Sequence, residues 1–187
     1  MAYSLAQRAL HWAIAAAVLV LVPVGLAMKA RGDAGTWDGV TNALYSWHKA
    51  IGFALLLAMG ARIALRLRRG VPPYPEGFPP RFAAMARWFH RLLYALLVAV
   101  PLLGWAGVTA YPALVTVGGL HLPPMPFVPV DQSLAKSLFA LHGTMALALA
   151  ALALVHVAGL VAHVVLWKHA VLARMWPGAR GRGRLPP

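Results

Sequence analysis

The sequence predicts an all-α integral membrane protein, a four-helix bundle with both termini in the cytoplasm. Of its 187 residues, 61% are hydrophobic and only 11% are charged, whereas about 25% are charged in an ordinary soluble domain. The apolar residues also gather in four runs, each long enough to span a bilayer at about 20 residues. We expect spans at roughly 5–28, 44–67, 85–111 and 133–167, within a single membrane domain of residues 1–187 that ends in a basic cytoplasmic tail at 168–187.

The first span opens with Ser4 and Gln7 in the spacing of a capping box, in which each side chain caps a backbone N–H near the helix start. Pro23 lies inside this run and predicts a kink. A cleaved signal peptide is the rival interpretation of residues 1–30. We disfavour it because the residues around Ala27 and Ala30 make a poor cleavage pattern.

Two stretches rich in proline separate the later spans. The sequence "RRGVPPYPEGFPPR" follows the second span, and "YPALVTVGGLHLPPMPFVPVDQ" follows the third. Neither can continue a helix, because proline lacks the N–H that a helix needs. We expect the second stretch to form an ordered cap over one membrane face.

The distribution of charge predicts the orientation. The side that holds the N-terminus, the loop after the second span and the C-terminal tail has 13 of the 17 Lys and Arg residues. The opposite side has the other cations and three of the four acids: Lys29, Arg31, Lys49, Lys136, Asp33, Asp38 and Asp131. The positive-inside rule then places both termini in the cytoplasm. The net charge of +13 therefore belongs to cytoplasmic loops of a multi-pass protein of the bacterial inner membrane, in contact with lipid and not with nucleic acid.

The chain has no cysteine. This excludes disulfides, thiolate metal sites, iron–sulfur clusters and haem attached through cysteine. Any metal or cofactor must therefore be held by histidine, methionine or one of the few acids.

Four histidines lie in the predicted spans at two depths. His142 and His156 are 14 residues apart, which on a helix is about 21 Å along the axis and about 40° around it. They therefore share a face, with one in each leaflet. His48 starts the second span on the periplasmic side, and His11 lies near the cytoplasmic start of the first span. We therefore expect His48 to lie at the same depth as His142, and His11 at the same depth as His156.

Two pairs of neutral imidazoles on facing helices predict two haems with histidine at both axial positions. Zinc and copper are disfavoured, because tetrahedral zinc takes three or four close ligands. Arg62 follows His48 by the same 14 residues and needs an anionic partner inside the membrane, which a haem propionate would supply. The alternative is that Arg62 reaches the cytoplasmic headgroups. Lys49, Lys136 and Arg31 could serve the outer haem in the same way.

The remaining histidines are weaker candidates. His90 and His169 lie beside basic residues, and His121 lies in the predicted cap. For these three residues we favour interfacial or capping roles, since a single histidine near a helix end is more often such a residue than a ligand.

With these residues in place, the chain resembles the bacterial cytochrome b561 family, which is related to the cytochrome b subunits of nickel–iron hydrogenases. The matching pieces are "ALHW", "SWHKAIGFALLLAMGARIALRL", "PPYPEGFPP", "HRLLYALLVAVPLLGW", "AKSLFALHGT" and "HVAGLVAHVVLWKH". They occur in order over nearly the whole chain. The resemblance implies a di-haem b protein of the inner membrane that exchanges electrons with the quinone pool, and it implies His11, His48, His142 and His156 as the ligands of the haem irons.

One branch of that family resembles a superoxide oxidase, which takes electrons from superoxide at the periplasmic face and reduces ubiquinone. In that branch the residue matching His163 lies beside the quinone. His163 is seven residues after His156 and about 20° round the helix from it, which would suit a hydrogen bond to a quinone carbonyl. The alternative is an interfacial histidine. The three acids on the periplasmic side offset its cations, which weakens the attraction of that face for an anion such as superoxide.

The leading hypothesis is electron transfer through two haems b between a periplasmic donor, with superoxide as a candidate, and the membrane quinone. The second is a non-catalytic haem-bearing anchor that docks a soluble dehydrogenase or hydrogenase on the cap around residues 112–129. The third, a small transporter of metal ions or protons, is disfavoured because the spans contain no acid. No catalytic residue is assigned. If the chain is an enzyme, we expect an oxidoreductase of the superoxide:quinone type.

Overall fold

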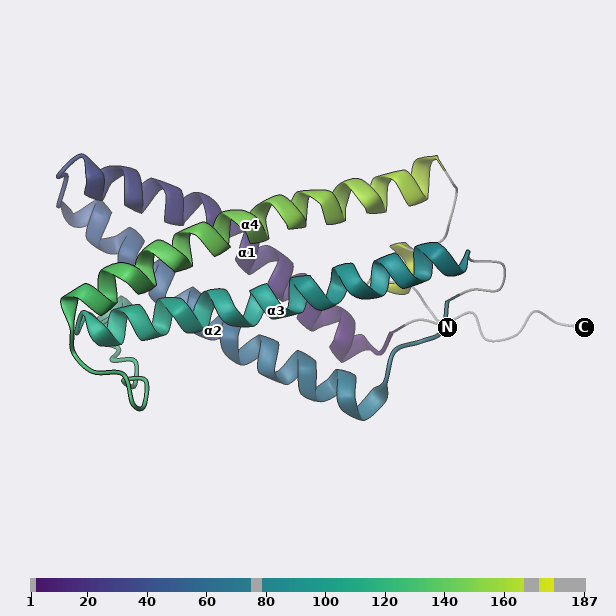
Figure 1. The fold of residues 1–187 in the computed structure, drawn as a ribbon, viewed down its shortest axis with the longest axis horizontal. Coiled ribbons are helices and arrows are strands. Elements are labelled where there is room, and N and C mark those ends of the chain that lie inside the picture. The colour runs from purple at the N-terminus through teal and green to yellow at the C-terminus, as the bar shows by residue number, and fades with distance from the viewer. Residues whose placement is uncertain (1–2, 75–78, 167–171, 177–187) are drawn as a thin grey trace, which may run out of the picture.

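The computed structural model describes residues 3–74, 79–166 and 172–176. Four long helices make up most of this part of the chain: α1 Leu5–Asp33, α2 Gly39–Arg69, α3 Pro80–Ala110 and α4 Gln132–Val165 (Figure 1). Two short 3₁₀ turns, η1 Val117–Gly119 and η2 Leu172–Arg174, accompany them. Each of the four helices is long and apolar enough to cross a membrane. The predicted all-α class with four long apolar helices is confirmed.

α1, α2 and the starts of α3 and α4 extend beyond the apolar segments that predict them, whereas the far ends of α3 and α4 stop one and two residues short of theirs. Capping residues set the starts of the helices. α1 begins after Ser4, and the predicted capping box with Gln7 is present. α2 begins after Asp38 and α4 after Asp131, and each of these carboxylates accepts a hydrogen bond from a backbone N–H in the first turn. α3 begins at Pro80, a residue suited to the first turn because it has no N–H to leave unbonded.

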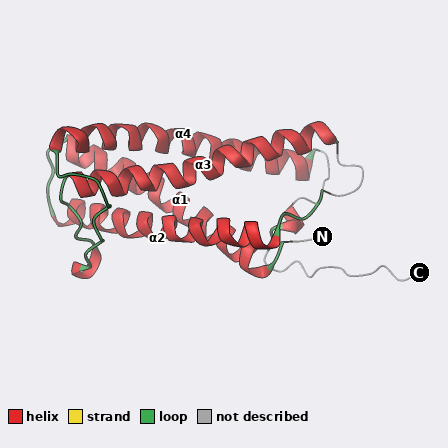
Figure 2. Ribbon diagram, turned by 60° about the horizontal axis from the view of Figure 1, so that its bottom comes forward, coloured by secondary structure: helices red, strands yellow, loops and turns green. Residues whose placement is uncertain are grey.

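The bundle is built from two helix pairs, α1 with α2 and α3 with α4, which the two views of the ribbon show running side by side (Figure 2). Ile14 and Leu21 of α1 pack against Leu55 and Met59 of α2. Leu93, Leu96 and Val100 of α3 pack against Leu149 of α4. Many large apolar side chains instead face outward, such as Leu19, Leu57 and Leu154. An apolar outer surface on a bundle of this length suits contact with lipid.

We name the two ends of the bundle by what they carry. The basic end is where α1 and α3 begin and α2 and α4 end, and the cap end is the opposite one (Figure 1). At the basic end, the described part of the predicted tail lies against α1. Trp12 donates through Nε1 to the carbonyl of Met175 at 2.9 Å, and its ring lies edge-on to Trp176. Residues 167–171 and 177–187, which include His169, lie outside the described residues.

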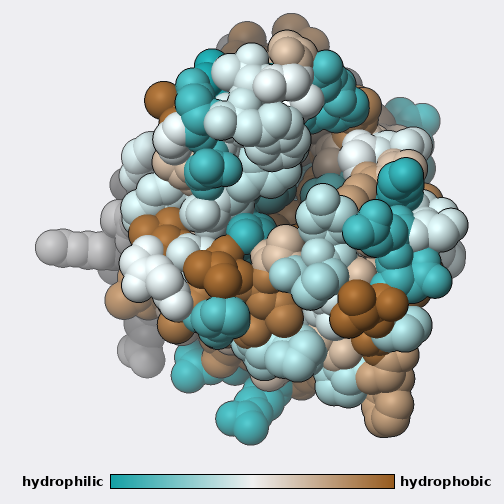
Figure 3. Space-filling model, turned by 90° about the vertical axis from the view of Figure 1, so that its left-hand side faces the viewer, coloured by the Kyte–Doolittle hydropathy of each residue, from teal (hydrophilic) through white to brown (hydrophobic). Residues whose placement is uncertain are grey.

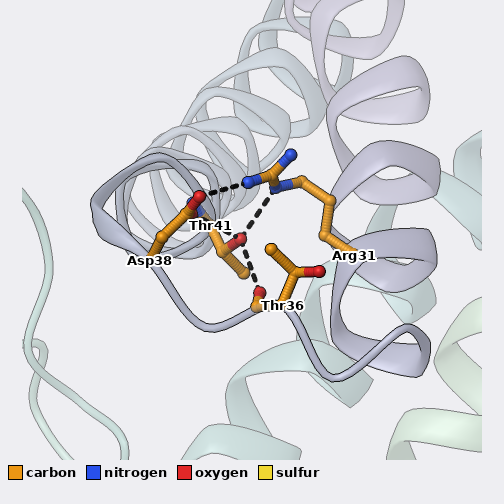
Figure 4. Close-up of polar contacts among 4 residues, drawn as sticks. All are labelled: Arg31, Thr36, Asp38 and Thr41. Atoms are coloured by element: carbon orange, nitrogen blue, oxygen red, sulfur yellow. Dashed lines mark hydrogen bonds and ion pairs between the residues drawn. The ribbon is translucent and has the colours of Figure 1, made fainter.

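A compact polar knot closes the turn between α1 and α2 at the cap end (Figure 4). Arg31 donates to the Asp38 carboxylate at 2.6 Å and to Thr41 Oγ1 at 2.8 Å, and the Thr41 hydroxyl donates to the carbonyl of Thr36. Thr41 is fully buried. The Thr41 backbone N–H and the Arg31 guanidinium stabilise the Asp38 anion and lower the pKa of that carboxyl to about 2.

Residues 111–131 form the expected ordered cap. Val115 and His121 pair as an isolated antiparallel bridge. Trp105 of α3 donates through Nε1 to the carbonyl of Pro123 at 2.7 Å, and Lys49 of α2 donates to the carbonyls of Ala113 and Val115. Figure 3 looks onto this end and shows hydrophobic groups set among hydrophilic ones. Phe127, Leu120 and Val130 are among the exposed apolar side chains of the cap.

Candidate functional site

The structure brings four histidines from three helices together as two pairs. Near the cap end, His48 of α2 faces His142 of α4, with ring centroids 6.1 Å apart and ring planes at 80°. Toward the basic end, His11 of α1 faces His156 of α4, at 6.4 Å and 79°. We call these the cap-end pair and the basic-end pair. α4 contributes one histidine to each, and it is the helix on which the 14-residue spacing was noted.

The spacing within each pair fits two imidazoles bound to one metal ion. An imidazole nitrogen lies about 2 Å from a metal ion that it ligates. Two rings in line on opposite sides of the ion then have centroids about 6.2–6.4 Å apart. The observed distances of 6.1 and 6.4 Å agree with this value. Both pairs thus have the donor type and the separation that an axially ligated haem iron requires.

Backbone groups of α3 and α1 hold the cap-end pair. His142 donates through Nδ1 to the carbonyl of Val100 at 2.8 Å, so its Nδ1 carries the proton and its Nε2 has the lone pair that binds a metal. Gly104 makes the approach possible, because a Cβ there would lie 3.1 Å from both Nδ1 and Cε1 of His142. Gly25 does the same for His48, whose Cε1 would lie 3.1 Å from such an atom.

Charged and polar side chains surround the basic-end pair. Arg62 of α2 is buried. It donates through Nε to the Tyr94 hydroxyl at 2.7 Å and through one terminal nitrogen to the carbonyl of Gln7 at 2.9 Å. Its other terminal nitrogen lies 3.5 Å from Nδ1 of His11. A guanidinium thus lies directly beside one histidine of this pair.

His90 of α3 also contacts the basic-end pair. Its ring centroid lies 5.2 Å from that of His156, with planes at 83°, and its Nδ1 donates to the carbonyl of Ala86 at 2.5 Å. The neighbouring Phe89 stacks on His156 at 6.3 Å. A pocket lined by Arg66, His90, Arg91 and Tyr94 adjoins this cluster. His90 is partly buried, and its ring contacts those of Phe89 and His156.

The other predicted site residues lie apart from the two pairs or have other partners. Lys49 binds cap carbonyls, Arg31 belongs to the turn between α1 and α2, and Lys136 and His121 are exposed. His163 is half-buried at the basic end of α4, with its ring centroid 6.0 Å from that of Phe82 at the start of α3. Among the residues that the structure describes, no group of three or more His or acidic side chains could hold a single metal ion.

Sequence reasoning missed His90, Gly25 and Gly104, although a signal for them exists. Gly25 follows His11 by 14 residues, and Gly104 follows His90 by 14. This is the spacing that places two residues near one helix face at the two depths.

Comparison with known proteins agrees with this geometry. Residues 2–178 match the family described as prokaryotic cytochrome b561. The chain is also similar to a protein of Yersinia pestis named probable superoxide oxidase CybB. The two are 29% identical over 184 residues, which cover 96% of this chain and 98% of that protein.

Proposed function

The chain belongs to the prokaryotic cytochrome b561 family, and on that premise we propose that it carries electrons across the inner membrane through two haems b. The donor would act at the cap end, in the periplasm, and quinone would be reduced at the basic end, toward the cytoplasm. The observation that carries the proposal is the spacing of two imidazole pairs, at 6.1 and 6.4 Å, on facing helices.

The family implies haem b, and the residues present fit it. His48 and His142 would hold one haem, and His11 and His156 the other. When bound, haem supplies one-electron redox chemistry at its iron, and the protein sets its potential through axial ligands, burial and hydrogen bonds. Val100 contributes by fixing the proton of His142 on Nδ1.

Arg62 would bind a carboxylate of the haem at the basic end. Ligation of iron through Nε2 of His11 requires a proton on Nδ1. That N–H cannot accept a bond from the Arg62 nitrogen that lies 3.5 Å away, so this donor becomes available to an anion. The three acids among the described residues, Asp33, Asp38 and Asp131, all lie at the cap end. A haem propionate would be a charge-assisted partner of the kind that a buried guanidinium needs.

His163 would contact quinone at the basic end. It lies seven residues beyond His156 on α4, about 10.5 Å along the helix, and it is partly accessible beside Phe82. A ring nitrogen there could donate to a quinone carbonyl.

Superoxide is the first donor to test, because a similar protein is named probable superoxide oxidase. In the reaction, two superoxide anions each lose one electron and become O₂, while a quinone gains two electrons and two protons. The charges of the cap end are largely balanced, since Lys29 pairs with Asp33 and Arg31 with Asp38. We therefore expect weak electrostatic steering of an anion toward this face.

The test is quinone reduction by the purified haem-loaded chain in detergent, with a superoxide flux from xanthine oxidase and a soluble ubiquinone. We expect superoxide-dependent formation of quinol that stops when superoxide dismutase is added. His163→Leu should slow the reaction at least tenfold and leave the haem spectrum unchanged. Full activity in this variant would remove His163 from the quinone site.

A haem-bearing anchor for a soluble dehydrogenase is the second candidate, favoured by the exposed apolar side chains of the cap. Phe127, Leu120 and Val130 are each more than half exposed, and exposed apolar groups at one end of a protein can mark a docking surface. A chain that binds two haems but is inert toward superoxide and quinone would favour the anchor.

A further inference from the structure

A small pocket at the basic end is lined by cationic and polar side chains that the proposed function does not use. It lies between α2, which provides Arg66, and α3, which provides His90, Arg91 and Tyr94. Its volume is about 160 Å³, smaller than the roughly 300–1,000 Å³ of sites that take a whole small-molecule ligand. The pocket therefore has the size for a small ionic group and not for a whole quinone or haem.

Two guanidinium groups line this pocket without a carboxylate beside them. Arg66 lies over the ring of Tyr94, 5.3 Å from its centroid, and Arg91 lies over the ring of Trp88 at 4.7 Å. Among the described residues, both ion pairs and all three acids lie at the cap end. Within that part of the chain, neither guanidinium has an anionic partner.

A third cation strengthens the need for an anion here. Arg62 lies one turn before Arg66 on α2, and its guanidinium is 5.6 Å from the centroid of the same Tyr94 ring. Like charges gathered where the dielectric constant is low repel one another unless an anion offsets them. The Tyr94 hydroxyl accepts a hydrogen bond from Arg62, so its own proton remains to be donated to another acceptor. An anion that accepts several hydrogen bonds suits this combination.

The pocket lies at the depth of the lipid headgroups. α2 has 31 residues and is about 46 Å long, which exceeds the roughly 30 Å of the hydrocarbon layer. Arg66 is three residues from the end of α2 at Arg69, about 4.5 Å along the axis. Trp88, beside Arg91, is exposed, and tryptophan is enriched at the boundary between hydrocarbon and headgroups. A headgroup phosphate can therefore reach these guanidiniums while its acyl chains stay in the bilayer.

We propose that this pocket binds the phosphate of an anionic membrane lipid, with Arg66 of α2 and Arg91 of α3 as its charged donors. A guanidinium binds phosphate through charge-assisted hydrogen bonds from a planar set of N–H groups, and basic pockets between membrane helices bind lipid headgroups. Because α2 and α3 belong to different helix pairs, the bound phosphate would link the two halves of the bundle. The site does not depend on haem, so the inference goes beyond the proposed function.

The test measures lipid binding to the haem-loaded chain, purified in a non-ionic detergent, by native mass spectrometry and by thermal unfolding. The probes are phosphatidylglycerol, which is anionic, phosphatidylcholine, whose phosphate is balanced by a choline cation, and inorganic phosphate. We expect a preference for phosphatidylglycerol over phosphatidylcholine of about tenfold. Phosphatidylglycerol should also raise the unfolding temperature, because a ligand that binds only the folded state stabilises it. Inorganic phosphate at the same concentration should not.

Arg66→Gln combined with Arg91→Gln should lower the affinity for phosphatidylglycerol about tenfold. The matched control is Arg68→Gln combined with Arg87→Gln, which removes two exposed arginines of the same two helices and should keep the affinity. Arg66→Lys combined with Arg91→Lys keeps both charges but loses the planar set of donors, so the affinity should fall about threefold. This lysine pair carries the test if the glutamine pair does not fold.

Several results would overturn the proposal. These are equal affinities in the glutamine pair and its control, equal binding of the two lipids by the wild type, and, where only the lysine pair folds, an affinity that it leaves unchanged. Inorganic phosphate as effective as phosphatidylglycerol would assign the pocket to a free anion.

Loss of a haem from the glutamine pair, but not from its control, would assign the pocket to a haem propionate and would also overturn the proposal. A wild-type chain that binds the lipid but no haem would refute the proposed function and support this inference, so the two failures are distinguishable.

Discussion

The cap-end pair is held by backbone, whereas the basic-end pair is surrounded by side chains that carry charge or a titratable proton. His142 rests on Gly104 and donates to the Val100 carbonyl, and His48 rests on Gly25. The Val100 carbonyl and the two glycines belong to the backbone, so they hold the cap-end imidazoles without a charged or titratable side chain. His11 and His156 instead lie beside Arg62 and His90.

This difference suggests that the two sites, each built from two imidazoles, have different roles in electron transfer. A centre that meets a one-electron donor needs a stable potential and a rigid cradle. A centre that faces quinone, which takes up protons along with electrons, benefits from nearby groups that can donate hydrogen bonds and balance charge. The asymmetry predicts that substitutions at one end leave the other unaffected.

The largest effect should come from removing one of the proposed haem ligands. If the proposal holds, His142→Ala should lose the cap-end haem and keep the basic-end haem, and His156→Ala should do the reverse, because each site would lose one of its two imidazoles. Haem per chain, measured by the pyridine haemochrome method, should fall by half in each. Retention of both haems in His142→Ala would refute the pairing.

Replacing a glycine that lies against a cap-end imidazole should reduce haem binding nearly as much, and only at the cap end. In Gly104→Val the new side chain would occupy the space of the His142 ring, since even a Cβ there lies 3.1 Å from it. We expect the affinity of the cap-end centre for haem to fall about 10–100-fold, measured by haem titration. Gly60→Val is the control, because a Cβ at Gly60 meets nothing within 4 Å. Equal losses of haem affinity in both variants would show that the contact between Gly104 and His142 has no special role.

Removing the buried guanidinium should weaken the basic end alone. Arg62→Gln breaks the hydrogen bonds to Tyr94 and Gln7, each worth about 1.5–3 kcal/mol when one partner is charged. We expect a lower unfolding temperature and a spectral change confined to the basic-end haem. Arg68→Gln, at an exposed arginine of the same helix, should change neither. A spectral change at the cap-end haem would contradict the claim that substitutions at one end leave the other end unaffected.

The smallest effect concerns the turn between α1 and α2. Because the folded pKa of Asp38 is lowered to about 2, the charged carboxylate stabilises the fold above its ordinary pKa of about 3.8. This contribution is lost as the pH falls through about 2. Thermal unfolding between pH 5 and pH 2 should therefore show a slightly smaller loss of stability in Asp38→Asn than in the wild type. An identical pH dependence would contradict the role of Asp38.

The helix count could be predicted from the sequence because hydropathy alone decides which segments enter a membrane. The ends were less predictable. α1 continues to Asp33, beyond the predicted end at 28, and α2 begins at Gly39, before the predicted start at 44. Capping groups, and not hydropathy, decide where a helix ends. The meeting of His48 with His142 and of His11 with His156 follows from helix spacing and depth, quantities that the sequence carries directly.

The partners of the charged side chains near the pairs could not be predicted, because they depend on how the helices rotate against one another. Lys49 holds the cap instead of facing the cap-end pair. Arg62 reaches Tyr94 and Gln7, on two other helices. The contact of the His90 ring with that of His156 also depends on tertiary packing.

The most direct test of the central claim is the number of haems bound by the purified chain, with a reduced-minus-oxidised spectrum and a redox titration. We predict a b-type spectrum, two haems per chain and two separable potentials, one for each histidine pair. One haem per chain, or none, would contradict the account.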